Sequence, residues 1–574
     1  MSKFIFVTGG VLSGIGKGIV VSSLGNLLKY RGYSVFIIKL DPYLNVDPGV
    51  LSPYEHGEVY VTEDGGETDL DLGHYERFTD ENFSKDSNYT SGKILSKILE
   101  KERQGFYNGK TLQYIPHVSD EIINILKNVE KKYNTDFVLV EIGGTVGDIE
   151  SNLFLYAISQ MGYESDFENS YYVHLTYVPF LETSQDFKTK PTQFSVSKLH
   201  AMGIRPNMIF LRTHKELNKE TAMKVAKASL LPIQNVVSIP DLKNVYEIPL
   251  YFEEKQVVQS ILDYFKLEQR PADLTKWEEF ESLYNAKKEE TLKIMMLGKY
   301  TEFVDAYKSI VEALRICAVY NKLEVDLKFL DTTTSAKKQE LNLENLKTAD
   351  GVVILPGFGK RGFENKVRAA AFTKEHNIPT FGICLGMQAM TVAQARHKGI
   401  INANSKEFAS DKDEVYVLDF NTKNGDKLQI GGTLRLGASE VEFKKDSLIA
   451  KIYKTDKTTE RHRHRYEVVK EFVPILEDER FVFSAKHPQS ELIEACEDPQ
   501  HNFYIGVQYH PEFLARPLRP HPLFDSFLKA ALKYKHSKNC LLYPSDSADD
   551  SIRGDNGYSR LTPTKLWLEN TIHE

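Results

Sequence analysis

A cysteine between two glycines is the feature of this chain that most clearly predicts chemistry. It lies in the segment Gly382-Ile383-Cys384-Leu385-Gly386, between a predicted strand and a helical pattern. This spacing is typical of a nucleophile elbow, because the glycines permit a sharp turn and the helix N-terminus lowers the pKa of the thiol. The segment Gln508-Tyr509-His510-Pro511-Glu512 supplies a base and a carboxylate. We therefore predict a triad in which His510 deprotonates Cys384 and Glu512 orients His510; the alternative is a buried structural cysteine.

Two further segments could assist a reaction at this thiol. Pro356-Gly357-Phe358-Gly359 follows a predicted strand at residues 352–355, and its backbone N–H groups could stabilise an oxyanion. Arg461-His462-Arg463-His464-Arg465 is a dense run of cations, which we interpret as a clamp for a carboxylate or phosphate. A nucleic-acid patch is the alternative, but the run is short and isolated on a chain with a net charge of −8.

A glycine-rich segment near the N-terminus predicts phosphate binding. The residues Gly9-Gly10-Val11-Leu12-Ser13-Gly14-Ile15-Gly16-Lys17-Gly18 follow a predicted strand and open a helical pattern. Glycines let backbone N–H groups approach phosphate oxygens, the helix N-terminus adds positive potential, and Lys17 would supply a point charge. The match to the usual phosphate-loop pattern is imperfect, since one extra residue separates Gly10 from Gly16 and Gly18 replaces the Ser or Thr that binds magnesium. The alternative is a glycine-rich turn without a ligand.

Because that hydroxyl is missing, a magnesium ion would need other oxygen ligands, and it favours one or two carboxylates with phosphates and water. Asp71 is one candidate, and Glu141, at the carboxyl end of a predicted strand, is the other. Ligands of parallel sheets gather at the carboxyl ends of strands, which favours Glu141. Taken alone, either carboxylate is more often a solvated loop residue.

The elements that must position these residues alternate between short apolar runs and helical patterns. Most of the runs are continuously apolar, as in strands buried on both faces of a parallel sheet. We therefore predict a doubly wound α/β fold in the first half of the chain and a second α/β series after it. The predicted strands are residues 4–8, 35–40, 137–142, 171–178, 208–212 and 236–239, then 292–297, 325–330, 351–355 and 380–384, followed by a β-rich stretch at 414–443.

The 574 residues allow two to four domains at roughly 100–200 residues each. A polar stretch with a helical pattern separates the two α/β series, and the last residues are rich in Ser and Asp, typical of a disordered tail. Four scattered cysteines and no long apolar run favour a reducing, cytoplasmic setting, without zinc sites, disulfides or membrane spans. We predict a first α/β domain at 1–268, a linker at 269–291, a second α/β domain at 292–536 and a tail at 537–574.

A phosphate loop and a thiol amidohydrolase on one chain suggest coupled chemistry, in which ammonia from glutamine meets an acceptor activated by ATP. Here the sequence resembles the CTP synthase family, glutamine-dependent enzymes that aminate UTP, from Phe4 to about Leu532. The motifs that carry the resemblance are residues 7–18, Lys39-Leu40-Asp41-Pro42-Tyr43, His56-Gly57-Glu58-Val59, residues 69–78 and 141–150, Lys188-Thr189-Lys190-Pro191-Thr192-Gln193, residues 382–388 and 461–466, and Tyr509-His510-Pro511-Glu512.

The resemblance implies a P-loop-type synthetase fold, a class I glutamine amidotransferase fold and a role for each matching residue. The implied ATP-binding residues are Gly14, Ile15, Gly16, Lys17, Gly18, Lys39, Asp71 and Asp241, with Asp71 and Glu141 holding magnesium. The implied residues for UTP, and in part for CTP, are Ser13, Asp148, Ile149, Glu150, Lys188, Thr189, Lys190, Pro191, Thr192, Gln193 and Lys224. The implied glutamine-binding residues are Gly357, Leu385, Gly386, Met387, Gln388, Glu407 and Arg465.

The resemblance also implies the reaction and its partners. ATP would phosphorylate O4 of UTP, and ammonia passed internally from Cys384 would displace the phosphate, in the last committed step of CTP synthesis. GTP is the expected activator, CTP the expected feedback inhibitor, and a homotetramer, with filaments in some members, the expected assembly. Neither nucleic acid nor membrane is an expected partner.

Two loops depart from the family pattern. The family's Pro-Gly-Gly-Phe-Gly loop lacks one Gly here, which bears on the oxyanion role of Gly357. The loop before Gly431-Gly432-Thr433-Leu434-Arg435-Leu436-Gly437 is short, and it would serve as a lid that helps to bind GTP.

Two other classes of protein share part of this pattern. The cobyrinic acid amidases also join a phosphate-loop ligase to a thiol glutaminase, but they lack the Lys-Thr-Lys-Pro-Thr-Gln and Gly-Asp-Ile-Glu segments. A non-enzymatic filament or scaffold protein is disfavoured because every catalytic residue type is present.

Overall fold

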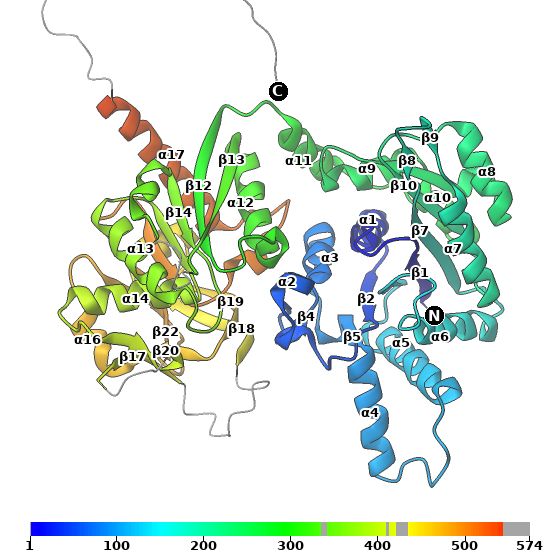
Figure 1. Cartoon of the computed structure of the whole chain (residues 1–574), viewed down its shortest axis with the longest axis horizontal. Helices are drawn as coiled ribbons and strands as arrows, with labels where there is room; N and C mark the ends of the chain where they lie inside the picture. Colours follow the sequence, from blue (N-terminus) through cyan, green and yellow to red (C-terminus); the bar gives the residue numbers. More distant parts are fainter. Residues whose placement is uncertain (1, 334–340, 409–412, 421–433, 543–574) are drawn as a thin grey trace, which may run out of the picture.

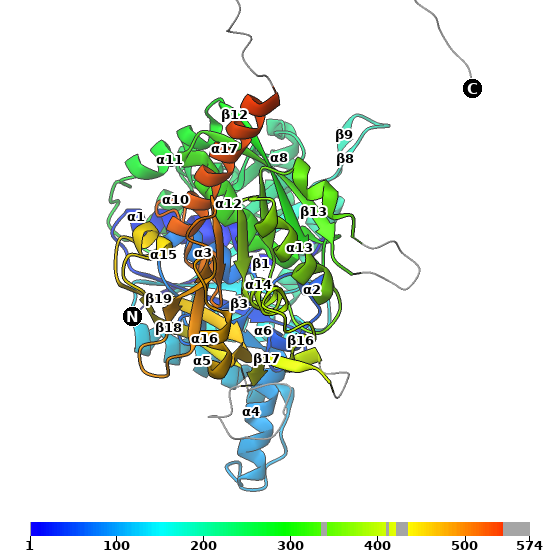
Figure 2. The ribbon, with the colours of Figure 1, turned by 90° about the vertical axis from the view of Figure 1, so that its left-hand side faces the viewer.

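The computed structural model describes residues 2–333, 341–408, 413–420 and 434–542. The chain forms two α/β lobes, which Figure 1 shows side by side, with the N-terminal lobe in blue to blue-green and the C-terminal lobe in green to red. Helix α4 (Ser91–Arg103) projects from the N-terminal lobe in that view and in the perpendicular view of Figure 2. The lobes pack against each other through a buried aromatic cluster and through ion pairs described below.

An all-parallel sheet of seven strands forms the centre of the N-terminal lobe, in the order β11-β10-β7-β1-β6-β2-β5. The central strands are buried along nearly their whole length, as their continuous apolar sequence predicts. All six strands predicted for this half are confirmed. The strands are β1 (Lys3–Gly9), β2 (Val35–Asp41), β5 (Asn88–Thr90), β6 (Phe137–Ile142), β7 (Ser170–Tyr177), β10 (Met208–Thr213) and β11 (Val236–Pro240).

Helices surround this sheet (Figure 1), as the alternation of apolar runs and helical patterns predicts. They are α1 (Lys17–Tyr30), α2 (Pro53–His56), α3 (Asp71–Thr79), α5 (Ser119–Tyr133), α6 (Asn152–Glu164), α7 (Lys190–Ala201), α8 (Lys219–Ser229), α9 (Ile248–Glu254) and α10 (Val257–Tyr264). Two short strands, β3 (Tyr60–Val61) and β4 (Glu67–Thr68), form a hairpin before α3.

A nine-stranded mixed sheet forms the centre of the C-terminal lobe, in the order β13-β12-β14-β15-β23-β22-β21-β18-β19. Its first five strands are parallel, and the last four continue it in antiparallel fashion. The predicted second α/β series is confirmed. The strands are β12 (Glu290–Gly298), β13 (Leu323–Asp331), β14 (Gly351–Ile354), β15 (Thr380–Ile383), β18 (Arg435–Phe443), β19 (Lys457–His464), β21 (Val482–Lys486), β22 (Ile493–Glu497) and β23 (Tyr504–Val507).

A smaller sheet and several helices complete this lobe. The sheet joins β16 (Ala403–Ser405), β17 (Val415–Phe420) and β20 (Tyr466–Val468), so the predicted β-rich stretch contains β17 and β18. The helices are α12 (Lys308–Tyr320), α13 (Phe363–Glu375), α14 (Leu385–His397), α15 (Leu448–Tyr453), α16 (Val473–Leu476) and α17 (Pro522–Leu542). The short loop expected to act as a lid falls on residues 421–433, outside the described residues.

The segments between and after the lobes carry structure of their own. Helix α11 (Thr275–Asn285) lies within the expected linker, and its Trp277 and Phe280 are buried against both lobes. The expected end of the second domain at residue 536 falls inside α17, which continues to Leu542. Lys535 and Lys538 anchor this helix by ion pairs to Glu290 and Asp350. Among the described residues, no helix combines the length and apolar character that crossing a bilayer requires.

Candidate active sites

The loop between β1 and α1 is shaped to bind an anion. Gly14 and Gly16 have positive φ angles of 68° and 104°, a region that favours glycine. Gly16 caps α1 without any side-chain hydrogen bond, so the first amides of the helix remain for a ligand. Arg212 Nη1 donates to the carbonyl of Ile15 at 2.8 Å. The predicted cradle, from Gly14 to Gly18, lines a cavity of about 680 Å³ at the carboxyl ends of β1, β2 and β6.

Two buried lysines bring positive charge to this cavity. Lys17 Nζ donates to the carbonyl of Gly144 at 2.9 Å, and burial lowers the pKa of Lys17. Lys39 Nζ lies 2.6 Å from Oδ1 of Asp69 and also pairs with Asp71. Burial lowers the pKa of Lys39, but the surrounding carboxylates prevail and raise it well above its usual value. Both lysines are therefore placed to hold phosphate oxygens.

The missing Ser or Thr of the loop has a structural reason. A Cβ at position 18 would lie 2.3 Å from Oδ1 of Asp71, which is far inside contact distance. The carboxylate of Asp71 thus occupies the space that the hydroxyl-bearing side chain fills in the usual phosphate loop. Gly18 therefore leaves room for the Asp71 carboxylate, which remains the candidate for the oxygen ligand that the loop lacks.

Asp71 and Glu141 form a donor set that suits magnesium. Glu141 is buried at the end of β6, where Tyr75 donates a hydrogen bond to it from α3. Burial and the charge of Asp71 raise the pKa of Glu141 to about 8, so a cation between these carboxylates would be favourable. Magnesium favours one or two carboxylates together with phosphate oxygens, and these two carboxylates would provide such a set.

A second cavity of about 420 Å³ adjoins the first and shares Ile15, Gly16 and Arg212 with it. Its apolar walls include Ile239 from β11. Asp241 lines it and lies 3.0 Å from Nδ1 of His214. An apolar slot with a carboxylate at its edge, next to a phosphate loop, suits a nucleobase.

The predicted UTP residues lie in three places, one of which belongs to the first cavity. Ser13 lines the cavity itself. Asp148, Ile149 and Glu150 are exposed in the loop after β6. The others lie around the start of α7 and on α8, where Lys188 pairs with Asp186 at 2.9 Å and both Lys188 and Lys224 lower the pKa of Asp186. In this group Lys190 and Pro191 open α7 after Thr189, the hydroxyl of Thr192 lies 2.9 Å from that of Thr176, and Gln193 donates to Thr189 at 3.0 Å.

In the C-terminal lobe, Cys384 occupies a sharp turn between β15 and α14. Its φ of 52° and ψ of −104° are unusual for a residue with a side chain, as in a nucleophile elbow. The flanking glycines are required sterically. A Cβ at Gly382 would lie 2.4 Å from the sulfur of Met390, and a Cβ at Gly386 would lie 2.2 Å from the carbonyl oxygen of Ile354.

The predicted base and carboxylate meet beside this thiol. His510 Nδ1 lies 2.7 Å from Oε1 of Glu512, and its ring stacks on Phe513. Burial lowers the pKa of His510, but Glu512 and Cys384 raise it to about 10 in total. Gln508 also donates to the sulfur of Cys384 at 3.7 Å, a contact that the sequence did not predict although Gln508 lies in the same motif. The arrangement places a base beside the thiol and a carboxylate beside the base, as activation of a nucleophile requires.

The shortened oxyanion loop is held in place by two lysines that the sequence did not single out. Lys299 donates to the carbonyl of Gly359 at 2.7 Å and also to that of Phe358. Lys366 is buried and donates to the carbonyl of Leu355 at 2.5 Å. Gly357 has a positive φ of 152° and lines the Cys384 cavity. The loop thus remains beside the nucleophile despite the missing glycine.

The residues expected to hold glutamine surround the elbow. Leu385, Gly386, Met387 and Gln388 form the buried first turn of α14. Gln388 donates to the carbonyl of Tyr466 at 3.1 Å, while its buried Oε1 has no hydrogen-bond partner among the described residues. Glu407 accepts from the amide of Gly359 at 2.6 Å, and burial raises its pKa although Arg465 lowers it. A carboxylate beside an arginine suits the charged end of an amino acid.

The cation run lies on β19 and at its end, and strand periodicity divides it into two faces. The histidines, His462 and His464, are buried and lie 3.0 Å apart. The predicted clamp for a ligand is not what Arg461 and Arg463 form, because both reach carboxylates of the chain itself. Arg461 pairs with Glu76 and Arg463 with Glu67, both in the N-terminal lobe. Their separation along the chain made these partners invisible in the sequence.

One segment of the N-terminal lobe borders both sites. A cavity of about 90 Å³ at Cys384 is lined by Gly357 and His510 and, from the other lobe, by Pro53, Glu58 and Val59. Between those residues in the chain, Glu55 and His56 line the 680 Å³ cavity. Burial raises the pKa of Glu58 to about 7 although Ser309 donates to it.

A phosphate loop with carboxylates in one lobe and a glutaminase-type triad in the other define an ATP-dependent ligase that takes its nitrogen from glutamine. Comparison with protein families agrees. Residues 3–267 match the family described as CTP synthase N-terminus, and residues 302–530 match Glutamine amidotransferase class-I.

Similar proteins identify the family more narrowly. A CTP synthase of Mycoplasmopsis pulmonis is 54% identical over 93% of this chain and 98% of its own length. One from Hydrogenobaculum sp. is 46% identical over 94% of this chain and 99% of its own. The solved glutaminase domain of Trypanosoma brucei CTPS is 33% identical over 42% of this chain and 94% of its own, with a TM-score of 0.39. The chain belongs to the CTP synthase family.

Proposed function

We propose that this chain converts UTP to CTP, with ATP activating UTP and glutamine supplying the nitrogen. The observation that carries the proposal is the segment 53–59, which lines the cavity at Cys384 and the cavity at the phosphate loop. We expect a nitrogen released at Cys384 to pass along this segment to the phosphate-loop cavity. Ammonia in water at neutral pH is mostly protonated and non-nucleophilic, so a closed route keeps it reactive.

In the C-terminal lobe, the thiolate of Cys384 attacks the side-chain amide of glutamine. Backbone N–H groups of Gly357 and Leu385 stabilise the oxyanion, and His510 gives a proton to the departing ammonia. Glu512 holds the imidazole in position. Water then hydrolyses the thioester and releases glutamate. Gln388, Glu407 and Arg465 hold the amino-acid end of the substrate.

In the N-terminal lobe, the γ-phosphoryl group of ATP is transferred to O4 of UTP, and ammonia displaces the phosphate at C4. Lys17, Lys39 and the loop amides neutralise the phosphates, and positioning supplies most of the catalysis of such a transfer. Asp241 borders the adenine. Asp71 and Glu141 would hold magnesium, which neutralises phosphate charge when bound. Ser13 and the residues around the 141–150 loop, α7 and α8 would hold UTP or CTP.

Other properties are proposed from the family. They are activation by GTP, feedback inhibition by CTP, a homotetramer able to form filaments, and a cytoplasmic location without nucleic-acid or membrane partners. The proposed domains are 1–268 for the synthetase, 269–291 for the linker, 292–536 for the amidotransferase and 537–574 for the tail.

The test is an assay of the purified chain with UTP, ATP, magnesium and either glutamine or ammonia. We expect CTP from both nitrogen donors, with one glutamate released for each CTP in the glutamine reaction. Absence of CTP with either donor would overturn the proposal. A parallel reaction with GTP should run faster with glutamine and unchanged with ammonia, and no rate change would show that the short loop has lost the activator.

The Gly18→Ser variant tests the role of the space beside Asp71. The new side chain must displace the carboxylate, because its Cβ would lie 2.3 Å from Oδ1. A displacement of about 1 Å at a reacting site costs about 10²-fold in rate, so ammonia-driven CTP formation should fall by that factor. Glutaminase activity serves as the internal control and should persist. An unchanged synthesis rate would remove Asp71 from the proposed metal site.

The Glu512→Gln variant tests the charge that sustains the His510 imidazolium. An opposite charge at hydrogen-bond distance raises a histidine pKa by about 1–3 units, so the alkaline fall of glutaminase kcat/KM should move to lower pH by that amount. The wild-type limb should extend toward pH 10, where the raised pKa of His510 lies. The raised pKa of His510 also affects the stability of the fold. The protonated imidazole contributes fully to the free energy of unfolding below about pH 6.5, and this contribution is lost as the pH rises through about 10.

The control for this pH profile is Glu491→Gln, an exposed carboxylate paired with Lys470 at the surface. Its profile should match that of the wild type. An identical alkaline limb in Glu512→Gln would show that Glu512 does not set the charge state of His510.

A further inference from the structure

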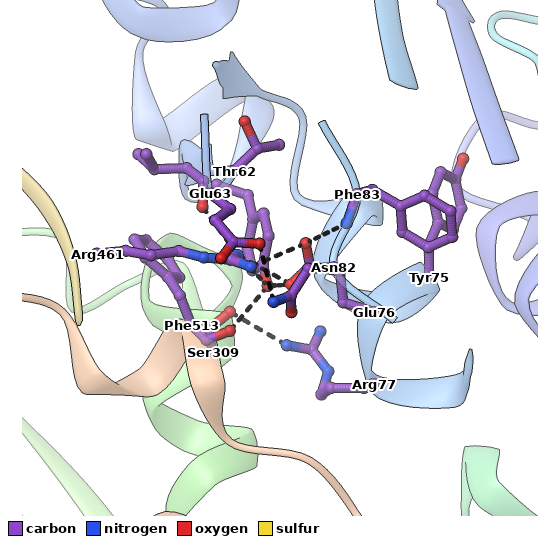
Figure 3. Close-up of polar contacts among 12 residues, drawn as sticks. Thr62, Glu63, Tyr75, Glu76, Arg77, Asn82, Phe83, Ser309, Arg461 and Phe513 are labelled. Carbon is purple, nitrogen blue, oxygen red and sulfur yellow. Dashed lines mark hydrogen bonds and ion pairs between the residues drawn. The ribbon is translucent and has the colours of Figure 1, made fainter. Parts of the chain in front are cut away.

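Helix α3 touches the nucleotide site with one side and the C-terminal lobe with the other. Asp71, at its first turn, faces the phosphate loop, and Tyr75 donates to Glu141. The two residues after Tyr75 point the other way: Glu76 meets Arg461, and Arg77 donates to Ser309 of α12 at 3.1 Å. Figure 3 shows Tyr75 on one side of the helix and the polar contacts of Glu76 on the other.

Glu76 is the centre of a buried network that joins the lobes. It accepts from Tyr60 at 2.6 Å and from the amide of Phe83 at 3.0 Å, both in its own lobe. From the other lobe it accepts two hydrogen bonds from Arg461, at 2.9 and 3.2 Å, and one from Arg516. The side chains of Glu76, Arg461 and Arg516 are at most 1% exposed. Because these charges are buried, separating them would leave an unpaired charge away from water at a large cost in free energy. The contact between the lobes is therefore rigid at this point.

Both arginines lead from Glu76 to the catalytic histidine. The backbone carbonyl of Arg461 accepts the amide of His510 at 2.8 Å. Arg516 donates to the carbonyl of Phe513 at 2.7 Å, and the ring of Phe513 stacks on that of His510. Glu76 is thus two steps from His510 through Arg461 and three steps through Arg516 and Phe513. It also lies five residues along one short helix from Asp71.

The next arginine of β19 repeats the pattern. Arg463 donates from its side chain to Glu67 at 2.8 Å and to the carbonyl of Gly49 at 2.9 Å. Its own backbone carbonyl lies 3.8 Å from the sulfur of Cys384. Arg461 and Arg463, which lie on the same face of β19, therefore contact the N-terminal lobe with their side chains. Their backbone carbonyls contact the amide of His510 and the sulfur of Cys384.

We propose that Glu76 is a positioning residue that couples the nucleotide site to the glutaminase triad through Arg461. The inference rests on the proposed function and deepens it. A nucleotide that engages the phosphate loop bears on Asp71 and hence on α3. Because Glu76 is clamped to β19, a shift of the helix moves the backbone that holds His510. Glutamine hydrolysis is thereby favoured when ATP and UTP are bound. By linkage, glutamine bound at the triad also raises the affinity of the nucleotide site.

The experiment compares the wild type with Glu76→Gln and with Asp80→Asn. Asp80 also makes an ion pair across the lobes, with Arg519, but its side chain is 37% exposed and that of Arg519 is 59% exposed. Exposed pairs contribute little, so Asp80→Asn is the matched control. Three quantities are measured: ammonia-driven CTP formation, glutaminase kcat/KM with and without ATP and UTP, and the ratio of glutamate released to CTP formed.

For Glu76→Gln we expect the stimulation of glutaminase by ATP and UTP to fall by about 5- to 150-fold, the usual range of coupling between sites. The ratio of glutamate to CTP should rise above that of the wild type, while ammonia-driven synthesis persists. Asp80→Asn should behave as the wild type. Unchanged stimulation in Glu76→Gln, or an equal loss of ammonia-driven synthesis, would overturn the inference.

A second variant decides the matter if Glu76→Gln does not fold. Arg461→Lys keeps the charge but loses the two-pronged geometry of the guanidinium, so the stimulation should fall by a smaller factor. Wild-type stimulation in a folded Arg461→Lys would overturn the inference. Failure of the wild type itself to form CTP from ammonia is a different result, since it contradicts the proposed function rather than the role of Glu76.

Discussion

The Cys384→Ala variant is expected to lose CTP formation from glutamine and to keep CTP formation from supplied ammonia. Removal of a triad nucleophile lowers turnover by about 10⁴-fold or more, because the step that breaks the amide bond has no other attacking group. The phosphate loop and its carboxylates lie in the other lobe, so the phosphoryl transfer should proceed. The measurement is CTP formation from each nitrogen donor, with glutamate release followed in parallel.

The control is Cys496→Ala. Cys496 is a buried thiol on β22, and burial raises its pKa to about 12, so it stays protonated and inert. This variant should form CTP from both donors at the wild-type rate. If Cys384→Ala lost both activities while remaining folded, the two-site scheme would be wrong.

The Lys17→Ala variant is expected to lose CTP formation and to keep glutaminase activity. Its CTP formation should fall with either nitrogen donor, by about 10²–10³-fold, as when one group that stabilises developing charge is removed. Glutaminase activity without nucleotides should survive, because Lys17 is confined to the cavity of the phosphate loop. Glutamate release and CTP formation, measured on the same preparation, separate the two activities.

Lys29→Ala is the matched control for this variant. Lys29 lies at the other end of α1, where it pairs with Glu81 and donates to the carbonyl of Thr79. It should retain full CTP formation. An equal loss of synthesis and of glutaminase turnover in Lys17→Ala would point to a structural role for the loop instead of phosphate binding.

Much of the fold and of both sites could be predicted from local patterns. The strands of the N-terminal sheet are continuous apolar runs, and burial on both faces is the physical reason for such runs. The elbow at Cys384 was predictable because two glycines at fixed offsets are needed to avoid clashes. His510 and Glu512 lie two residues apart, so their hydrogen bond is local.

The unpredicted parts depend on contacts between distant residues. Glu76 and Arg461 are 385 positions apart, and no spacing rule joins them. The glycine at position 18 departs from the phosphate-loop pattern because Asp71, from another helix, lies beside it, and the local sequence does not contain that neighbour. Lys299 and Lys366 belong to no motif, and the carbonyls to which they donate lie in other segments of the chain, so these contacts depend on the tertiary structure.

The alternating faces of β19 place a constraint on how this gene can change length. The strand pairs with β18 over eight successive residues, from Lys457 to His464. Insertion or deletion of a single residue within it would exchange the two faces from that point on. Histidines would then meet the carboxylates of the other lobe, and arginines would enter the core. A point substitution along this strand removes one contact, whereas a shift of the strand register would remove the contacts of Arg461 and Arg463 with the other lobe in one event.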